Sequence, residues 1–200
     1  SQNAGFSLLA AWGLRMRGVP VVHAVCRRGM SRCVLGTQRD NPQATPPCAG
    51  CVEQSQAVFT GADTRWLEFT PDAALQQALA GLSTEQMQTF TYRDAPLGAL
   101  VLPSLRWILR RHHLADDAAT QTLFREYILS AWNIIGAMGS LLDSVQPQAL
   151  LIFNGMSYPE AAARWAAQQR GIPVVTHEVA HAPFTAFFTH GEATAYPHGV

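Results

Sequence analysis

Four cysteines are the residues whose spacing is most typical of a metal site. All four lie between residues 26 and 51, with intervals of six, fourteen and two residues between successive cysteines. Two thiolates separated by two residues can face one ion, and four thiolates suit tetrahedral zinc. The segment is rich in Gly, Arg and Pro and follows no periodic pattern, so a structural zinc ion would replace packing that this loop lacks. We expect such a site at Cys26, Cys33, Cys48 and Cys51. Unmetallated or disulfide-linked cysteines, an iron–sulfur cluster and a redox pair are the alternatives.

The segment His177-Glu-Val-Ala-His181 has the H-E-x-x-H spacing of zinc proteases. That chemistry needs both imidazoles on one face of a continuing helix. Here the motif follows 173–176, which is strand-like, and Pro183 opposes helix continuation. We therefore interpret it as a strand-to-loop turn, and a zinc hydrolase using His177, Glu178 and His181 is the less favoured alternative.

Two polar loops follow neighbouring apolar runs, at residues 154–160 and 177–181. In open parallel sheets, ligands bind beyond the carboxyl ends of the strands. We therefore expect both loops to line one site. General-base catalysis is expected from Glu178 or His177. Hydrogen bonds to the hydroxyl groups of a ligand such as a sugar are expected from Asn154, Gly155, Ser157 and His181.

The same pattern of a helix, a glycine and a strand occurs twice among the elements that would position these residues. A helical pattern at 6–17 stops at Gly18 and runs into an apolar strand pattern at 20–25. A second helical pattern at 159–170 stops at Gly171 and runs into a strand pattern at 172–176. A further apolar run at 148–153 precedes the second helix, which completes a βαβ unit.

The part between these two units, from about residue 71 to 145, is predicted to be mostly helical. Ser83 and Gln86 fit a capping box. Asp116 and Asp117 supply carboxylates to the N-terminus of a long helix that ends near Val145. We expect one α/β domain over residues 1–200, with a Rossmann-like parallel sheet, a helical middle portion and a cysteine loop at 26–51.

The composition excludes several classes of function. The 200 residues are 48% hydrophobic and 14% charged, which is typical of a folded chain. The 14 basic and 14 acidic residues cancel, so a nucleic-acid partner is disfavoured. Every cation is Arg, which excludes Schiff-base chemistry and a P-loop lysine. No run of 18 apolar residues is present, so no transmembrane segment is expected.

Five segments carry a resemblance to a family. They are Arg17-Gly-Val-Pro-Val-Val22, Arg28-Gly-Met-Ser-Arg-Cys33, Pro46-Pro-Cys-Ala-Gly-Cys51, Phe153-Asn-Gly-Met-Ser-Tyr-Pro-Glu-Ala161 and Arg170-Gly-Ile-Pro-Val-Val-Thr-His-Glu178. Together the chain resembles the N-terminal half of bacterial glycosyltransferase-like proteins of capsule and surface polysaccharide synthesis. The resemblance implies the two-domain GT-B architecture, in which the N-terminal domain binds the acceptor and the C-terminal domain binds the nucleotide-sugar. It also implies that the four-cysteine site is structural.

Relative to that family, the chain begins at what would be the first helix and ends before a donor-binding domain. We therefore expect an acceptor-binding domain that is inactive without its donor domain. A cytoplasmic location is expected, and a peripheral membrane contact stays open. The family usually has glycine at the position of Ala180, and an aromatic or another residue at that of His181, so the H-E-x-x-H match looks incidental. The other class of function left open is a non-catalytic Rossmann-like module that binds a glycan or a protein.

Overall fold

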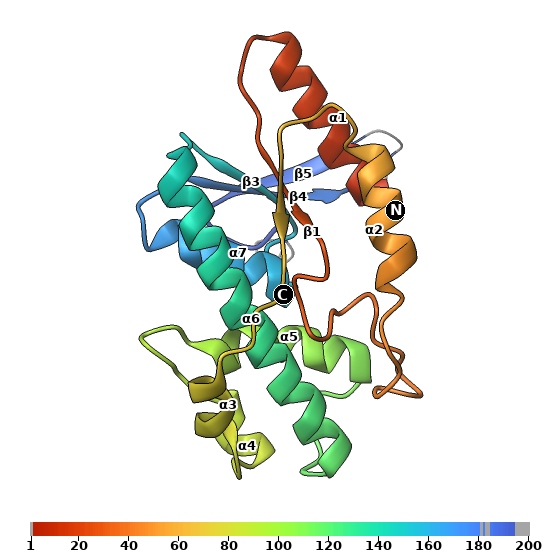
Figure 1. Cartoon of the computed structure of the whole chain (residues 1–200), viewed down its shortest axis with the longest axis vertical. Helices are drawn as coiled ribbons and strands as arrows, with labels where there is room; N and C mark the ends of the chain where they lie inside the picture. The colour runs from red at the N-terminus through yellow and green to blue at the C-terminus, as the bar shows by residue number, and fades with distance from the viewer. Residues whose placement is uncertain (1, 181, 183–184, 195–200) are drawn as a thin grey trace.

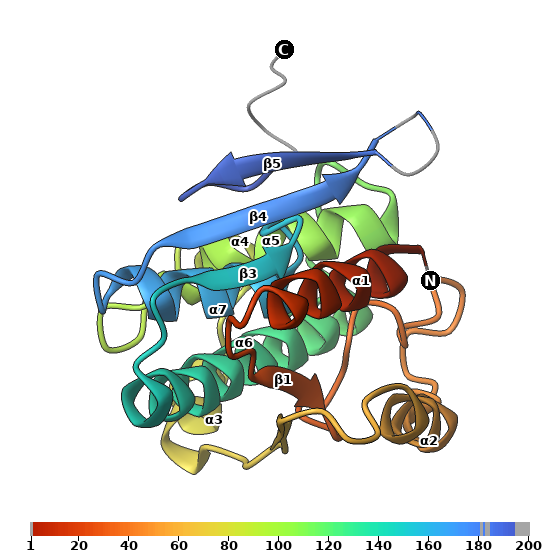
Figure 2. The same ribbon diagram turned by 90° about the horizontal axis from the view of Figure 1, so that it is seen from above.

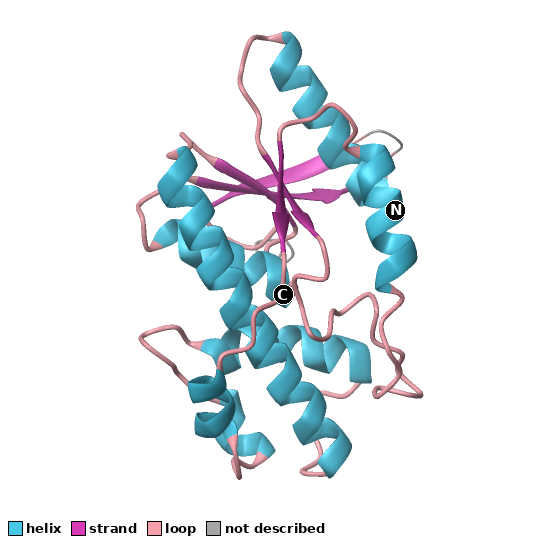
Figure 3. Ribbon diagram, viewed as in Figure 1, coloured by secondary structure: helices cyan, strands magenta, loops and turns pink. Residues whose placement is uncertain are grey.

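The computed structural model describes residues 2–180, 182 and 185–194, and the side chains from residue 5 onward. It has the α/β class that the sequence predicts (Figures 1 and 3). In chain order the elements are α1 (Gln2–Met16), β1 (His23–Cys26), α2 (Cys48–Val58), β2 (Thr64–Leu67), α3 (Ala73–Leu79), α4 (Thr84–Gln88), α5 (Leu97–Leu109), α6 (Ala118–Val145), β3 (Leu150–Phe153), α7 (Tyr158–Gln168), β4 (Val174–Val179) and β5 (Ala186–His190).

Both predicted helix–glycine–strand units form. After α1 the chain reverses at Gly18, whose φ is 77°, and after α7 it reverses at Gly171, whose φ is 66°. These left-handed backbone conformations carry little cost for glycine, which has no Cβ. The βαβ unit β3–α7–β4 is also present, with β3 and β4 parallel.

The single parallel sheet that we expected is divided into two. β1 pairs in parallel with β2, while β3 pairs in parallel with β4, and β5 adds to β4 in antiparallel orientation. Within the described residues no strand joins the two sheets. Figure 2 shows β5, β4 and β3 side by side, with β1 beyond β3 and α1 lying in front. A Rossmann-like sheet is therefore present only as these parallel pairs.

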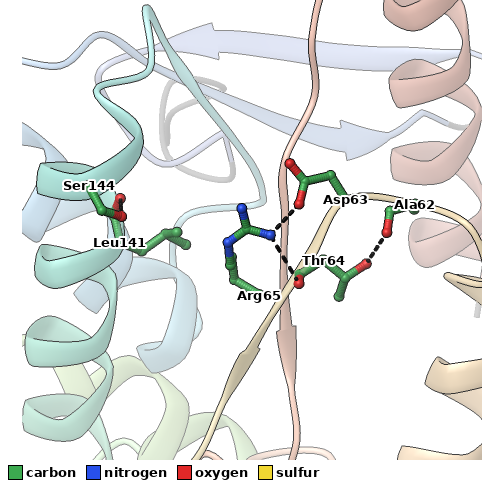
Figure 4. A network of polar contacts seen from close by, with 6 residues as sticks. All are labelled: Ala62, Asp63, Thr64, Arg65, Leu141 and Ser144. Atoms are coloured by element: carbon green, nitrogen blue, oxygen red, sulfur yellow. Dashed lines mark hydrogen bonds and ion pairs between the residues drawn. The ribbon is translucent and has the colours of Figure 1, made fainter.

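The strands β2 and β5 were not predicted, and the first turn of the helix α2 falls in the segment 26–51 that we expected to be a loop. β2 has only four residues, and its pattern of half-buried and exposed side chains gives little apolar periodicity. At its start the Arg65 guanidinium bonds Asp63, while the Thr64 hydroxyl donates to the Ala62 carbonyl over 3.2 Å (Figure 4). These are local contacts, so the strand is stabilised mainly by its parallel partner β1.

The helix α6 is the centre of the hydrophobic core. It crosses most of the molecule, and its buried side chains include Phe124, Tyr127 and Ile128 (Figure 1). Among the described helices it is the one that is long and apolar enough to cross a membrane by length and composition. Half of its most apolar stretch is buried inside the protein, against α5 and α7 among others, as expected for a core helix.

The predicted helix caps form, with one change of partner. Ser83 and Gln86 make the reciprocal capping box of α4. Asp117 caps α6 by accepting a hydrogen bond of 2.8 Å from the Thr120 N–H. Asp116 accepts from the Thr84 N–H over 2.7 Å and from the Gln121 side-chain amide of α6 over 2.9 Å, and so it ties the start of α4 to the start of α6. Adjacent carboxylates therefore serve two different helices.

Candidate functional site

The H-E-x-x-H segment begins in a strand. Residues 177–179 belong to β4, whose described part ends at Val179. Side chains alternate between the two faces of a strand, so His177 and Glu178 point to opposite faces of the sheet. Residues 177–180, the described part of the segment, do not form the helix that a zinc hydrolase requires. His181 lies outside the described residues.

Glu178 meets Asn154 at the carboxyl ends of β4 and β3. The Asn154 side-chain amide Nδ2 donates a hydrogen bond of 2.8 Å to Glu178 Oε2. The Val179 N–H donates a bond of 3.0 Å to the other oxygen, Oε1. The Glu178 side chain is half-buried, and each carboxylate oxygen keeps a second lone pair. The two loops predicted to converge are therefore joined by a side-chain hydrogen bond.

The turn after β3 places the Asn154 side chain. Asn154 has a left-handed φ of 54°, and Gly155 follows with a φ of 76°. The Asn154 Oδ1 accepts a hydrogen bond of 2.9 Å from the Met156 N–H. A Cβ at Gly155 would lie 2.8 Å from Thr176 Cγ2 and 3.3 Å from Ala193 Cα. The glycine thus allows close approach of this turn to β4, and it has no side chain with which to bind a ligand.

Ser157 stands at the N-cap of α7. Its side chain does not cap the helix, and it is half-buried. The first N–H of α7, that of Tyr158, donates a bond of 2.8 Å to the Ser104 hydroxyl of α5. The start of α7 is therefore fixed by α5, close in sequence to the Asn154 turn.

His177 is fully buried on the face of the sheet covered by α1. Its ring lies 5.2 Å from that of Phe6 and 5.8 Å from that of Phe153, and its Nε2 is 3.0 Å from the Ser7 hydroxyl. Burial lowers the pKa of His177, while the nearby Glu178 charge acts in the opposite direction. A buried neutral imidazole in this position joins α1 to β4 and lies away from the Asn154 and Glu178 side chains.

Glu160 is a candidate that the sequence reasoning missed. It lies in the first turn of α7, and its Oε2 atom is buried without a hydrogen-bond partner among the described residues. Burial raises the pKa of Glu160 to about 7. An acidic residue in the first turn of a helix is common because it complements the helix dipole, so its position did not indicate that Glu160 is buried. Carboxyl groups with such shifted pKa values are often functional.

The four cysteines occupy three elements of the first half of the chain. Cys26 ends β1, Cys33 lies in the following loop, and Cys48 and Cys51 are in the first turn of α2. All four are free thiols, and Cys51 is the exposed one. Among the described residues, no three His, Cys, Asp or Glu side chains are already arranged as a metal-binding group.

Comparison with known proteins does not place the chain in a family. No protein-family model matches it, and neither a curated protein nor a solved structure gives a significant match.

Proposed function

We propose that this chain is the acceptor-binding domain of a glycosyltransferase that uses a nucleotide-sugar donor. The hydrogen bond between Asn154 and Glu178 carries the proposal, because it joins the carboxyl ends of two neighbouring parallel strands. This is the edge at which open α/β sheets bind ligands. The resemblance in sequence to surface-polysaccharide glycosyltransferases supports the same assignment.

In the proposed reaction Glu178 is the general base. Its carboxylate takes the proton of an acceptor hydroxyl while that oxygen attacks the anomeric carbon of the donor sugar. The new C–O bond forms as the bond to the nucleoside diphosphate breaks, and the diphosphate leaves with the electron pair. Asn154 holds Glu178 in place by its hydrogen bond, and the donor is bound by a separate donor-binding domain.

Acceptor recognition is assigned to the turn between β3 and α7. The Asn154 amide has a second N–H, and Ser157 has a hydroxyl that does not cap α7. Both groups are suited to sugar hydroxyls. His177 is assigned a positioning role, because its ring is enclosed by aromatic side chains on the other face of β4. His181 stays a candidate contact from the sequence.

The first test is acceptor binding by this chain. Calorimetric titration with surface-polysaccharide oligosaccharides is expected to show binding that Ser157→Ala weakens about tenfold, the equivalent of one hydrogen bond. Glu85→Gln, an exposed carboxylate on α4, is the control and should bind like the wild type. Absence of binding to every oligosaccharide tested, by a folded chain, would contradict the acceptor role.

A non-catalytic binding module is the second candidate. The observation that favours it is an exposed apolar stripe on α1, where Leu9, Trp12 and Met16 are 70%, 60% and 80% exposed. Their spacing places them on one face of the helix. This candidate predicts a partner whose binding survives Glu178→Gln and is lost in Trp12→Ala.

A further inference from the structure

The helix α2 lacks the packing that holds the other long helices. It has no buried residue, and in Figures 1 and 2 it lies at the edge of the molecule. The N-cap residue Pro47, directly before α2, makes no side-chain hydrogen bond to the helix. At its other end the Phe59 ring lies 5.0 Å from the His23 ring of β1. Some further interaction at its first turn would therefore be needed to fix α2 against the domain.

That first turn carries two of the four thiols. Cys48 and Cys51 are three residues apart, so their side chains project from the same side of α2. Backbone N–H groups and the helix dipole make the N-terminus of a helix locally positive. Thiolates, which are the metal-binding form of cysteine, are stabilised at such positions.

The other two thiols sit in a repeated turn, each with a glycine three residues later. The Gly29 N–H donates to Cys26 Sγ over 3.3 Å, and the Gly36 N–H donates to Cys33 Sγ over 3.1 Å. Such backbone bonds to sulfur orient a ligand and favour its charged form. A Cβ at Gly29 would lie 2.7 Å from the Leu67 carbonyl oxygen, so this turn requires glycine.

The cysteine loop is close to the residues that begin α2. A Cβ at Gly36 would lie 2.8 Å from both Cys33 Sγ and Pro46 Cβ, so the second turn packs directly before Cys48. Cys33 therefore lies beside the residues that lead into Cys48 at the start of α2.

The loop itself is fixed to the core helix α6. The Ser31 N–H donates to the Ser130 hydroxyl over 3.1 Å, and the Asn133 side-chain amide donates to the Gly29 carbonyl over 2.9 Å. The buried Tyr127 hydroxyl donates to the Thr37 hydroxyl over 3.0 Å. Cys33 therefore lies in a well-anchored segment, whereas Cys48 and Cys51 belong to the weakly packed helix.

We propose that Cys26, Cys33, Cys48 and Cys51 together bind one zinc ion, which fixes α2 to the cysteine loop and to the end of β1. Zinc prefers four ligands in tetrahedral geometry and is often bound by four thiolates. This site is independent of the glycosyltransferase proposal.

Among the described residues no metal-binding group is already arranged, so binding requires α2 to approach the end of β1. A hollow of about 490 Å³ lies here, and it is lined by Arg27, Arg28, Ala49, Val52, Glu68 and Phe69. Two of these residues are in the first turns of α2, and two directly follow Cys26. The arginines also balance the net charge of about −2 that zinc and four thiolates carry.

The test is elemental analysis of the full chain, purified under reducing conditions and dialysed against zinc-free buffer. We expect about one zinc ion per chain. Cys33→Ser and Cys48→Ser should each lose most of it, whereas Ser55→Ala in α2 and His113→Ala should retain it. Replacement by cobalt should give the absorption spectrum of tetrahedral thiolate coordination. The proposal would be overturned by a wild-type chain without zinc. It would also be overturned if His113→Ala loses the zinc and the cysteine variants retain it.

Two measurements on the wild type keep the test decisive if a cysteine variant fails to fold. Stepwise modification of the thiols should release one zinc for four thiols modified. Removal of zinc by a chelator should speed amide exchange in α2 by about tenfold or more and leave the middle of α6 unchanged. Disulfides in the reduced preparation, or zinc release without any change in α2, would contradict the proposed site.

Discussion

Asn154 is the residue on which the proposed site most depends, because it combines an unusual backbone conformation with a hydrogen bond to Glu178. The variant Asn154→Gly keeps the left-handed turn and removes only the side chain. We expect turnover in the complete two-domain protein to fall about tenfold, the equivalent of one charge-assisted hydrogen bond. Folding should be retained, as measured by circular dichroism. Unchanged turnover would remove Asn154 from the site.

The titration of Glu160 makes the free energy of unfolding depend on pH, in a direction that its raised pKa determines. Its pKa rises from 4.5 to about 7 on folding because of burial. Below the lower value both states are protonated, and between the two values the unfolded state ionises first. The free energy of unfolding should therefore fall as the pH rises through this window and then level off.

The variant Glu160→Gln removes this titration. At pH 8 it should be more stable than the wild type, by an amount on the order of 3 kcal/mol at most. At pH 4 the two proteins should be alike. Urea unfolding at both pH values measures the difference, with Glu85→Gln as an exposed control. Equal effects of Glu160→Gln at the two pH values would show that Glu160 does not titrate as stated.

Between elements, hydrogen bonds fix the cysteine loop to the core helix α6. The Ser130 hydroxyl accepts from the N–H groups of Ser31 and Arg32. Ser130→Ala would leave these groups without that acceptor in the interior, at a cost of about 1–3 kcal/mol of unfolding free energy. Ser144→Ala, at an exposed position of the same helix, should cost less than about 0.5 kcal/mol. Chemical denaturation measures both, and equal losses would contradict the anchoring role.

The cap of α6 supplies a second test of an element. Asp117→Ala should lower the unfolding free energy by about 1 kcal/mol, because the Thr120 N–H loses its acceptor. Asp117→Asn should restore most of the stability, because asparagine is an equally good N-cap. Since the helix-bonded carboxylate of Asp117 has a lowered pKa, the wild-type advantage over Asp117→Asn should fade as the pH falls below the ordinary range of aspartate.

The elements that the sequence predicted are those with strong local signals. Gly18 and Gly171 end helices, and Ser83 and Gln86 form the capping box of α4. The helix α6 has the apolar periodicity that the sequence shows. The prediction was wrong about the segment containing Cys48, because two prolines precede α2 and no apolar face marks the helix. β2 depends on pairing with β1, which lies far from it in the sequence, and β5 depends on pairing with β4, and neither pairing is contained in a local pattern.

The same limit applies to the site. Strand alternation separates His177 from Glu178, and the sequence indicated a strand only up to Thr176. From the sequence we expected only that the loops containing Asn154 and Glu178 lie at one edge of the sheet. Their side-chain contact depends on the strand register, in which Phe153 of β3 pairs with His177 of β4. Burial of Glu160 depends on the packing of α7 in the tertiary fold.

At the scale of the whole molecule, a helical core around α6 supports two small sheets, and each candidate site lies where strands of one sheet end. Cys26 is the last residue of β1 and Cys33 lies in the loop after it. Asn154 directly follows β3, and Glu178 lies near the end of β4. Because the sites belong to different sheets, their chemistry should be separable. Zinc content should be the same in Glu178→Gln as in the wild type, by elemental analysis.

The most direct measurement of the central claim is sugar transfer by this chain joined to the proposed donor-binding domain, with Glu178→Gln and Glu85→Gln compared with the wild type. The account predicts release of nucleoside diphosphate coupled to a glycosylated acceptor. It further predicts that Glu178→Gln lowers this turnover by about 10²- to 10⁴-fold, while acceptor binding and folding persist. Undiminished turnover in Glu178→Gln, or a complete protein that binds acceptor and never transfers sugar, would contradict it.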